Sequence, residues 1–138
     1  MRLLGGGFRL LIAGTGEAEY ESDLKQKAAG LPVEFAGFVR LPEFLEHTDM
    51  VILPSWEEPF GIVLLEAMAT GIPVIATGPA EVVSGVRIPP HNPGALADAI
   101  RTLRPDETIA RAREHVEKNF DIRKVTPRIE EFYSRVSG

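Results

Sequence analysis

Residues Ser55–Thr77 read SWEEPFGIVLLEAMATGIPVIAT and contain the clearest structural signals in the chain. Turn residues on either side of an apolar centre predict a loop, a helix, a turn and a strand, in that order. Every position from Gly61 to Ala69 is apolar or small except Glu66. A helix that is apolar on all sides is expected inside a fold, where an isolated carboxylate is costly. We therefore expect Glu66 to meet a partner, and a ligand hydroxyl is a suitable one.

Glu58 is the second unusual carboxylate in this stretch. One interpretation is a capping box, in which Ser55 caps the helix and Glu58 follows three residues later. Pro59 argues against it, because the residue before a proline is driven out of the helical conformation. We therefore expect Glu58 in the loop and a helix that begins near Phe60 or Gly61.

The two carboxylates then frame the start of the helix. The first N–H groups of a helix are unpaired and carry a partial positive charge, which favours phosphate. Glu66 would project about 7.5 Å further along the axis, at about 1.5 Å per residue. This arrangement fits a ligand with phosphates at its centre and hydroxyl-bearing rings on either side.

Composition narrows the class of protein. The length of 138 residues suits one domain, 1–138. Residues 1–7 can be interpreted as a non-native or truncated start of that domain. A net charge of −5 without a basic cluster argues against a nucleic-acid surface. There is no cysteine, and the three histidines, His47, His91 and His115, lack the spacing of metal ligands. We therefore expect no metal, and surface or loop roles for the histidines. No apolar run reaches the ~20 residues of a transmembrane helix, and the N-terminus is a poor signal peptide.

Short apolar runs alternate with polar, helix-like segments. The expected strands are Phe8–Ala13, Val33–Ala36, Met50–Leu53, Pro73–Ala76 and Val86–Ile88. This alternation predicts an α/β fold, a Rossmann-like doubly wound parallel sheet with helices on both faces. Ligands bind beyond the carboxyl ends of such strands. The loops expected at that edge, which would frame one cleft, are Gly14–Glu17, Gly37–Arg40, Pro54–Gly61 and Thr77–Glu81.

Weaker signals lie elsewhere in the chain. The turn Gly14-Thr15-Gly16 lacks the third glycine of a dinucleotide fingerprint, so a plain tight turn is favoured over a phosphate site. Phe38 lies either in a ligand-binding loop or in the core, and the sequence favours neither. Further on, Asn92 followed by a proline predicts a helix start, and Asp106 is expected to cap a later helix.

The central stretch resembles a known family. Glu58 and Glu66 have the Glu-seven-residues-Glu spacing of retaining, nucleotide-sugar-dependent glycosyltransferases of group 1 (family 4), which have two Rossmann-like domains, the GT-B fold. Flanking matches are Leu53-Pro54-Ser55, Pro59-Phe60-Gly61, Ala67-Met68-Ala69 and Gly71-Ile72-Pro73-Val74. The resemblance implies the carboxy-terminal, donor-binding domain of such an enzyme.

The resemblance also implies roles for single residues. Glu58 would be the catalytic-site carboxylate that holds hydroxyls of the donor sugar, and Glu66 would accept hydrogen bonds from the ribose. The main chain at Phe60, Gly61 and Ile62 would meet the sugar and diphosphate. Gly14, Phe38 and Val39 would line the same donor site. The resemblance implies that the substrate is a nucleotide diphosphate sugar and that no metal or other cofactor is needed. It also implies that the protein is cytoplasmic, or peripheral at the membrane in the full enzyme.

The sequence departs from the family at its start. Family members open this domain with a strand carrying Gly-Arg, followed by Lys-Gly, whose cations neutralise the departing diphosphate; Arg2 and Arg9 lack that context. The loop that contains Glu81 is also shortened. We therefore expect that the chain is a fragment, one half of a split enzyme or a truncated product, and that it is inactive alone. A separate acceptor-binding domain or chain, or a homodimer that completes the sheet, would complement it. The alternatives are a non-catalytic nucleotide-sugar- or partner-binding module and, less favoured, a sugar 2-epimerase.

Overall fold

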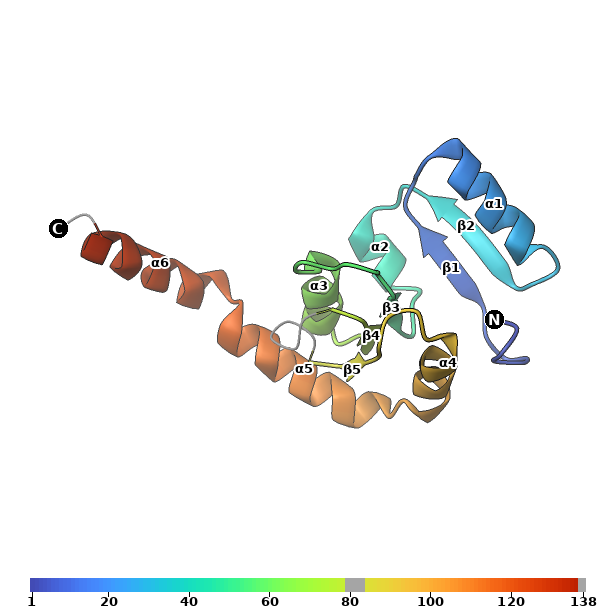
Figure 1. Ribbon diagram of the computed structural model, residues 1–138. Coiled ribbons are helices and arrows are strands. Elements are labelled where there is room, and N and C mark those ends of the chain that lie inside the picture. The colour runs from blue at the N-terminus through green and yellow to red at the C-terminus, as the bar shows by residue number, and fades with distance from the viewer. Residues whose placement is uncertain (79–83, 137–138) are drawn as a thin grey trace. The chain divides into compact units, whose positions relative to one another are not determined.

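The computed structural model describes residues 1–78 and 84–136 (Figure 1). The chain forms two compact units, Met1–His47 and Thr48–Gly138. Each unit contains parallel strands and helices, so the α/β class with parallel pairing is confirmed. The strands form a two-stranded sheet in the first unit and a three-stranded sheet in the second, rather than one continuous sheet.

The first unit is a βαβα arrangement with little core. It contains β1 (Leu10–Ala13), α1 (Ala18–Ala28), β2 (Val33–Gly37) and α2 (Leu41–Leu45). β1 and β2 pair in parallel. Leu45 is the one buried hydrophobic residue in the described part of this unit, and the apolar residues of β1 remain half-exposed. Two parallel strands with one helix between them bury few side chains completely, as expected for so small a sheet.

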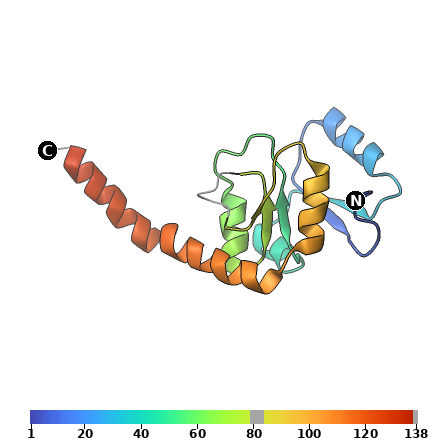
Figure 2. The same cartoon turned by 60° about the horizontal axis from the view of Figure 1, so that its bottom comes forward.

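The second unit contains the main core. Its elements are β3 (Val51–Leu53), α3 (Ile62–Thr70), β4 (Val74–Ala76), β5 (Val86–Arg87), α4 (Pro93–Thr102), α5 (Pro105–Asn119) and α6 (Ile122–Val136). The strands run parallel in the order β3-β4-β5, so the central strand β4 is buried along its whole length. Figure 2 shows α3 and α4 on opposite sides of this sheet. Leu64 and Met68 of α3 are fully buried, as is Ala112 of α5, against which α3 packs.

Local sequence explains most helix boundaries, with one correction. The Asn92 side chain accepts a hydrogen bond of 2.9 Å from the N–H of Ala95, so the predicted start of α4 is confirmed. The prediction that Asp106 caps α5 is wrong, because the cap position is Arg104 and the helix begins at Pro105. Proline is favoured at the first helical position, which moves Asp106 into the first turn.

The expectation that α3 is buried on all sides is also wrong. Leu64, Ala67 and Met68 form its buried face. The opposite face is open, since Ile62 is 65% exposed and Glu66 and Ala69 are exposed. Apolar composition predicted burial, but in this fold only one face of the helix has the sheet and α5 beside it. Glu66 therefore projects from the open face of α3.

Candidate functional site

The loop between β3 and α3 holds Glu58 at the start of the helix. The Glu58 side chain is half-buried, and its Oε1 accepts a hydrogen bond of 3.3 Å from the N–H of Phe60. Its Oε2 accepts one of 3.2 Å from the hydroxyl of Ser55. Ser55 does not cap the helix, because the cap position is Gly61. The prediction that Pro59 keeps Glu58 out of the helix is confirmed.

Gly61 sets the geometry of the helix start. It adopts the left-handed conformation, with φ of +76°, which turns the chain into α3. In the part of the chain that the structure describes, no acceptor is recorded for the N–H groups of Gly61, Ile62 or Val63. These groups are the unpaired donors found at every helix start, and they attract anions. The start of α3 therefore offers an electropositive end beside the Glu58 carboxylate.

Glu66 lies on the exposed face of the same helix. Among residues 1–78 and 84–136, no hydrogen bond or ion pair is recorded for its carboxylate. Both of its oxygens are therefore open to solvent or a ligand. The structure thus brings Glu58, the main chain at Phe60, Gly61 and Ile62, and Glu66 together on one loop–helix segment.

The loops after β3 and β4 are joined at the carboxyl edge of the sheet. The hydroxyl of Thr77 donates a hydrogen bond of 2.5 Å to the carbonyl oxygen of Ser55. The Nε–H of Arg87, in the neighbouring strand β5, donates one of 3.2 Å to the carbonyl oxygen of Gly78. The first bond holds the loop that carries Glu58 next to the end of β4, and the second joins β5 to the loop after β4. Glu81, which the sequence placed at this edge, lies outside the described residues.

The remaining predicted site residues belong to the first unit. Gly14 has φ of +120°, and its N–H donates a hydrogen bond of 2.7 Å to the carbonyl oxygen of Gly37. Phe38 is 87% exposed, so the alternative that placed it in the core is wrong. Val39 follows it in the same loop after β2. The assignment of Gly14, Phe38 and Val39 to a donor site stays a prediction.

Arg40, in a loop predicted at the ligand-binding edge, and Arg87, in β5, are both engaged elsewhere. Arg40 forms an ion pair of 3.0 Å with Glu43, and Arg87 donates to a backbone carbonyl. Both arginines are exposed, so no buried contacts fix either side chain in place for a phosphate. The positive end of α3 is therefore the main electropositive feature of this loop–helix segment.

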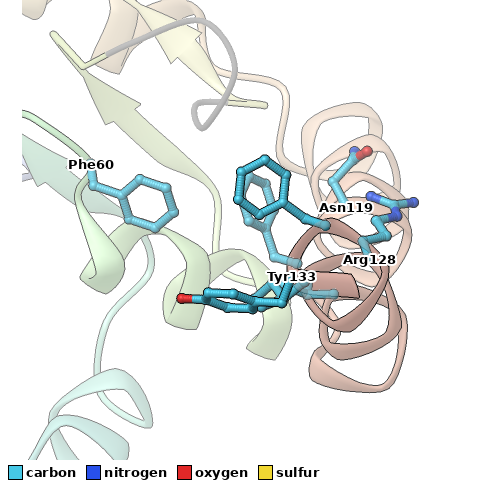
Figure 3. Close-up of a pocket in the computed structure, with 8 residues that line it drawn as sticks. Phe60, Asn119, Arg128 and Tyr133 are labelled. Atoms are coloured by element: carbon cyan, nitrogen blue, oxygen red, sulfur yellow. The ribbon is translucent and has the colours of Figure 1, made fainter. Parts of the chain in front are cut away.

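Two hollows were not predicted from the sequence. One, of about 290 Å³, lies at the carboxyl ends of β3, β4 and β5, where the rings of Trp56 and His91 are 4.8 Å apart. His91 has φ of +55°, which is uncommon outside glycine. The other is an apolar groove of about 610 Å³ beside Phe60 (Figure 3). It is lined by Phe60, Asn119, Phe120, Val125, Arg128, Ile129, Phe132 and Tyr133. The spacing of apolar residues in 122–136 was the signal that could have revealed this groove.

The described residues also bear on metal and membrane binding. Within 1–78 and 84–136, no three His, Asp or Glu side chains lie together as metal ligands would. No helix in these ranges is long and apolar enough to cross a membrane.

Comparison with known proteins identifies the relatives of this chain. Residues 2–106 match the sequence profile of the family described as "Glycosyl transferases group 1". The chain is 41% identical over 101 residues to an uncharacterised glycosyltransferase of Methanocaldococcus jannaschii, covering 64% of this chain and 26% of the relative. It is 31% identical over 104 residues to a GDP-mannose-dependent alpha-(1-6)-phosphatidylinositol dimannoside mannosyltransferase of Mycobacterium tuberculosis, covering 69% of this chain and 27% of the relative.

Solved structures agree with the sequence comparison. Sucrose-phosphate synthase of Thermosynechococcus elongatus superposes with a TM-score of 0.77 and 26% identity, over 93% of this chain and 38% of that enzyme. The chain thus spans about a quarter of the length of the two relatives above and less than half of that solved enzyme.

Proposed function

The chain belongs to the group 1 glycosyl transferases, and from this premise we propose that it binds the nucleotide diphosphate sugar donor of a retaining glycosyl transfer to an acceptor hydroxyl. One observation carries the proposal. Glu66 presents an exposed carboxylate without a partner among the described residues, on the same helix whose first N–H groups are open. The Glu66 carboxylate lies about one helical turn beyond the open N–H groups. This spacing suits a ligand in which a ribose, bound by the carboxylate, is next to a diphosphate, bound by the N–H groups.

Each proposed contact follows from the chemistry of its group. The two oxygens of Glu66 can accept hydrogen bonds from both hydroxyls of the ribose, which is a cis-diol. The N–H groups of Gly61 and Ile62 would donate to the diphosphate. Glu58 already accepts one hydrogen bond on each oxygen, and each oxygen retains a second lone pair for a hydroxyl of the donor sugar.

The proposed role in catalysis is positioning and charge stabilisation. A transfer that expels a diphosphate gains most from fixed donors aimed at the leaving group and from alignment of the reacting atoms. The helix end contributes only about half an elementary charge. Further cations are needed for turnover, and we propose that they come from a part of the enzyme beyond the described residues. The name of the mycobacterial relative, which includes GDP-mannose, supports a nucleotide diphosphate sugar as the donor class.

Thermal unfolding with nucleotides tests the proposal directly. The chain is melted alone and with millimolar UDP, GDP, ADP and the corresponding sugar nucleotides. At a hundred times its dissociation constant, a ligand should stabilise the fold by about 2.7 kcal/mol. At about 3–6 °C per kcal/mol, this corresponds to a rise in Tm of roughly 8–16 °C for a chain of this size. One base should produce the larger rise, and that base is then the one the donor carries.

Matched variants locate the site. Glu66→Ala should abolish the nucleotide-dependent rise while leaving the Tm of the free protein within about 2 °C, because exposed side chains contribute little to stability. Glu114→Ala, a change at an exposed carboxylate of α5, should preserve the full rise. A cooperative melt with no rise for any nucleotide, or a rise that persists in Glu66→Ala, contradicts the proposed site.

A further inference from the structure

The Glu58 carboxylate is held by two groups of its own loop. The hydroxyl of Ser55 donates a hydrogen bond of 3.2 Å to its Oε2, and the N–H of Phe60 donates one of 3.3 Å to its Oε1. The neighbouring Glu57 is exposed, and no hydrogen bond or ion pair is recorded for its carboxylate among residues 1–78 and 84–136. Of two adjacent carboxylates in this loop, one is therefore held in a defined orientation by the protein.

Ser55 is itself anchored to the end of a buried strand. The hydroxyl of Thr77 donates a hydrogen bond of 2.5 Å to the carbonyl oxygen of Ser55. Two residues earlier in the loop's approach, the carbonyl oxygen of Leu53 accepts one of 3.3 Å from the N–H of Thr77. Thr77 follows β4, whose three residues are all buried. Contacts therefore run without a gap from the buried central strand through Thr77 and Ser55 to the Glu58 carboxylate.

The Ser55 hydroxyl orients Glu58 rather than the start of α3. The cap position of α3 is Gly61, so Ser55 does not serve as the helix cap. A hydroxyl has one proton to donate, and that of Ser55 is donated to Glu58. Both side chains are half-buried. Because a hydrogen bond to a charged acceptor is stronger than one between neutral groups, it holds the two side chains in one arrangement. The carboxylate is thus oriented before a ligand arrives.

We infer that Ser55 is a positioning residue for the donor sugar, because it orients the carboxylate of Glu58. This inference rests on the proposed function, in which Glu58 accepts hydrogen bonds from hydroxyls of the transferred sugar. With one oxygen engaged by Ser55 and the other by Phe60, the carboxylate keeps one lone pair on each oxygen, in the plane of the group. Two hydroxyls on adjacent carbons of the transferred sugar match this pair of acceptors. A nucleoside diphosphate without that sugar does not use them.

A purely structural role for Ser55 leads to a different expectation. If its hydrogen bond served only to close the loop, losing it would weaken the binding of nucleotide and nucleotide sugar alike, because both ligands meet the same helix start. A positioning role affects only the ligand that carries the transferred sugar, since a misaligned acceptor loses its contacts with that sugar alone. The ratio of the two dissociation constants is therefore the quantity that separates these roles.

Isothermal titration calorimetry of the full chain with UDP and UDP-glucose, GDP and GDP-mannose, and ADP and ADP-glucose measures both constants. Ser55→Ala should raise the Kd of the nucleotide sugar about fivefold, the factor that corresponds to one lost hydrogen bond, and leave that of the nucleotide within about twofold. Ser55→Thr, which keeps the hydroxyl, should restore most of the affinity. Glu57→Ala, the matched change at the adjacent carboxylate, should alter neither constant. Circular dichroism should show every variant folded.

A double-mutant cycle shows whether Ser55 acts through Glu58. Glu58→Ala should remove the contribution of the transferred sugar to the affinity, and adding Ser55→Ala to it should raise the Kd of the nucleotide sugar no further. An unchanged Kd in Ser55→Ala, equal losses for nucleotide and nucleotide sugar, or losses at Ser55 and Glu58 that add overturns the inference and leaves the donor site standing. Binding of none of the nucleotides contradicts the proposed function itself, and the inference falls with it.

Discussion

The hydroxyl of Thr77 donates a hydrogen bond of 2.5 Å to the carbonyl oxygen of Ser55, joining the residue after β4 to the loop after β3. The backbone reinforces this connection, since the Thr77 N–H donates one of 3.3 Å to the carbonyl oxygen of Leu53. The loop held in this way is the one that carries Glu58. The position of this loop thus rests in part on the partly buried hydroxyl of Thr77, the residue that follows the neighbouring strand.

Replacing Thr77 with valine tests this dependence. Thr77→Val keeps the shape of the side chain but leaves the Ser55 carbonyl without this donor, at a cost of about 1 kcal/mol. The Tm should fall by roughly 3–6 °C, as measured by calorimetry. Thr77→Ser, which keeps the hydroxyl, should recover most of the loss. Equal Tm values for the valine and serine variants would show that the hydrogen bond contributes nothing.

Gly61→Ala should destabilise the start of α3. Gly61 has φ of +76°, and a Cβ built there would lie 3.0 Å from Cδ1 of Leu64, a fully buried side chain. A left-handed conformation costs an L-residue about 1–2 kcal/mol before any steric contact is counted. Urea denaturation should therefore show a loss of at least about 1 kcal/mol in the free energy of unfolding. Gly16→Ala is the control, because its Cβ would meet no atom within 4 Å; a similar loss in both variants would refute the explanation.

Gly85→Ala and Gly94→Ala should shift stability in opposite directions. A Cβ at Gly85 would lie 2.4 Å from the carbonyl oxygen of Val74, so the buried strand β4 must move. Overpacking of this kind costs about 1–3 kcal/mol. Gly94 lies in α4, and its Cβ would approach no closer than 3.4 Å to Asn92 Oδ1. Alanine there should stabilise the helix by about 0.5–1 kcal/mol. Thermal melts of both variants check the signs, and a stabilising Gly85→Ala would contradict the packing described.

Local rules in the sequence accounted for the individual elements. Proline and glycine positions predicted where α3 and α4 begin, because they act on the dihedral angles of adjacent residues. The apolar runs that became β1 to β5 were recognised from their composition. Glu66 was found because a carboxylate in an apolar run is anomalous wherever the run lies, and Glu58 because the proline after it keeps it out of the helix. These features depend on near neighbours, which a sequence contains.

Non-local features were not accessible in the same way. Composition could not tell which face of α3 would meet the sheet, so the exposure of Ile62 and Glu66 was missed. The division of the strands into two sheets depends on pairing between distant segments, which no local pattern specifies. The contact between Trp56 and His91 likewise joins residues that only the fold brings together. Phe38 was left undecided for the same reason, because burial is a property of neighbours rather than of the residue.

Titration of Asp121 gives a prediction for the start of α6. The Asp121 carboxylate accepts hydrogen bonds from the side chain of Arg123, at 2.6 Å to Oδ2, and from the backbone N–H of Arg123, at 2.9 Å to Oδ1. These contacts lower the pKa of Asp121 from 3.8 to about 2. The hydrogen bond from the Arg123 side chain is the larger cause, and the one from the backbone N–H is the second. A lowered pKa means that the charged form is favoured in the folded protein. The stabilisation of the helix start is therefore complete above pH 3.8 and is lost as the pH falls toward 2.

Carbon-13 NMR of the Asp121 carboxyl group measures this pKa residue by residue, separately from the other carboxylates. The unaltered chain should titrate near pH 2. Arg123→Ala removes the guanidinium and keeps the backbone N–H, so the pKa should rise only part of the way toward 3.8. Arg128→Ala, a change to an arginine further along α6, should leave it near 2. A midpoint near 3.8 in the unaltered chain would mean that Arg123 does not hold this carboxylate in solution, and that α6 begins without its charged cap.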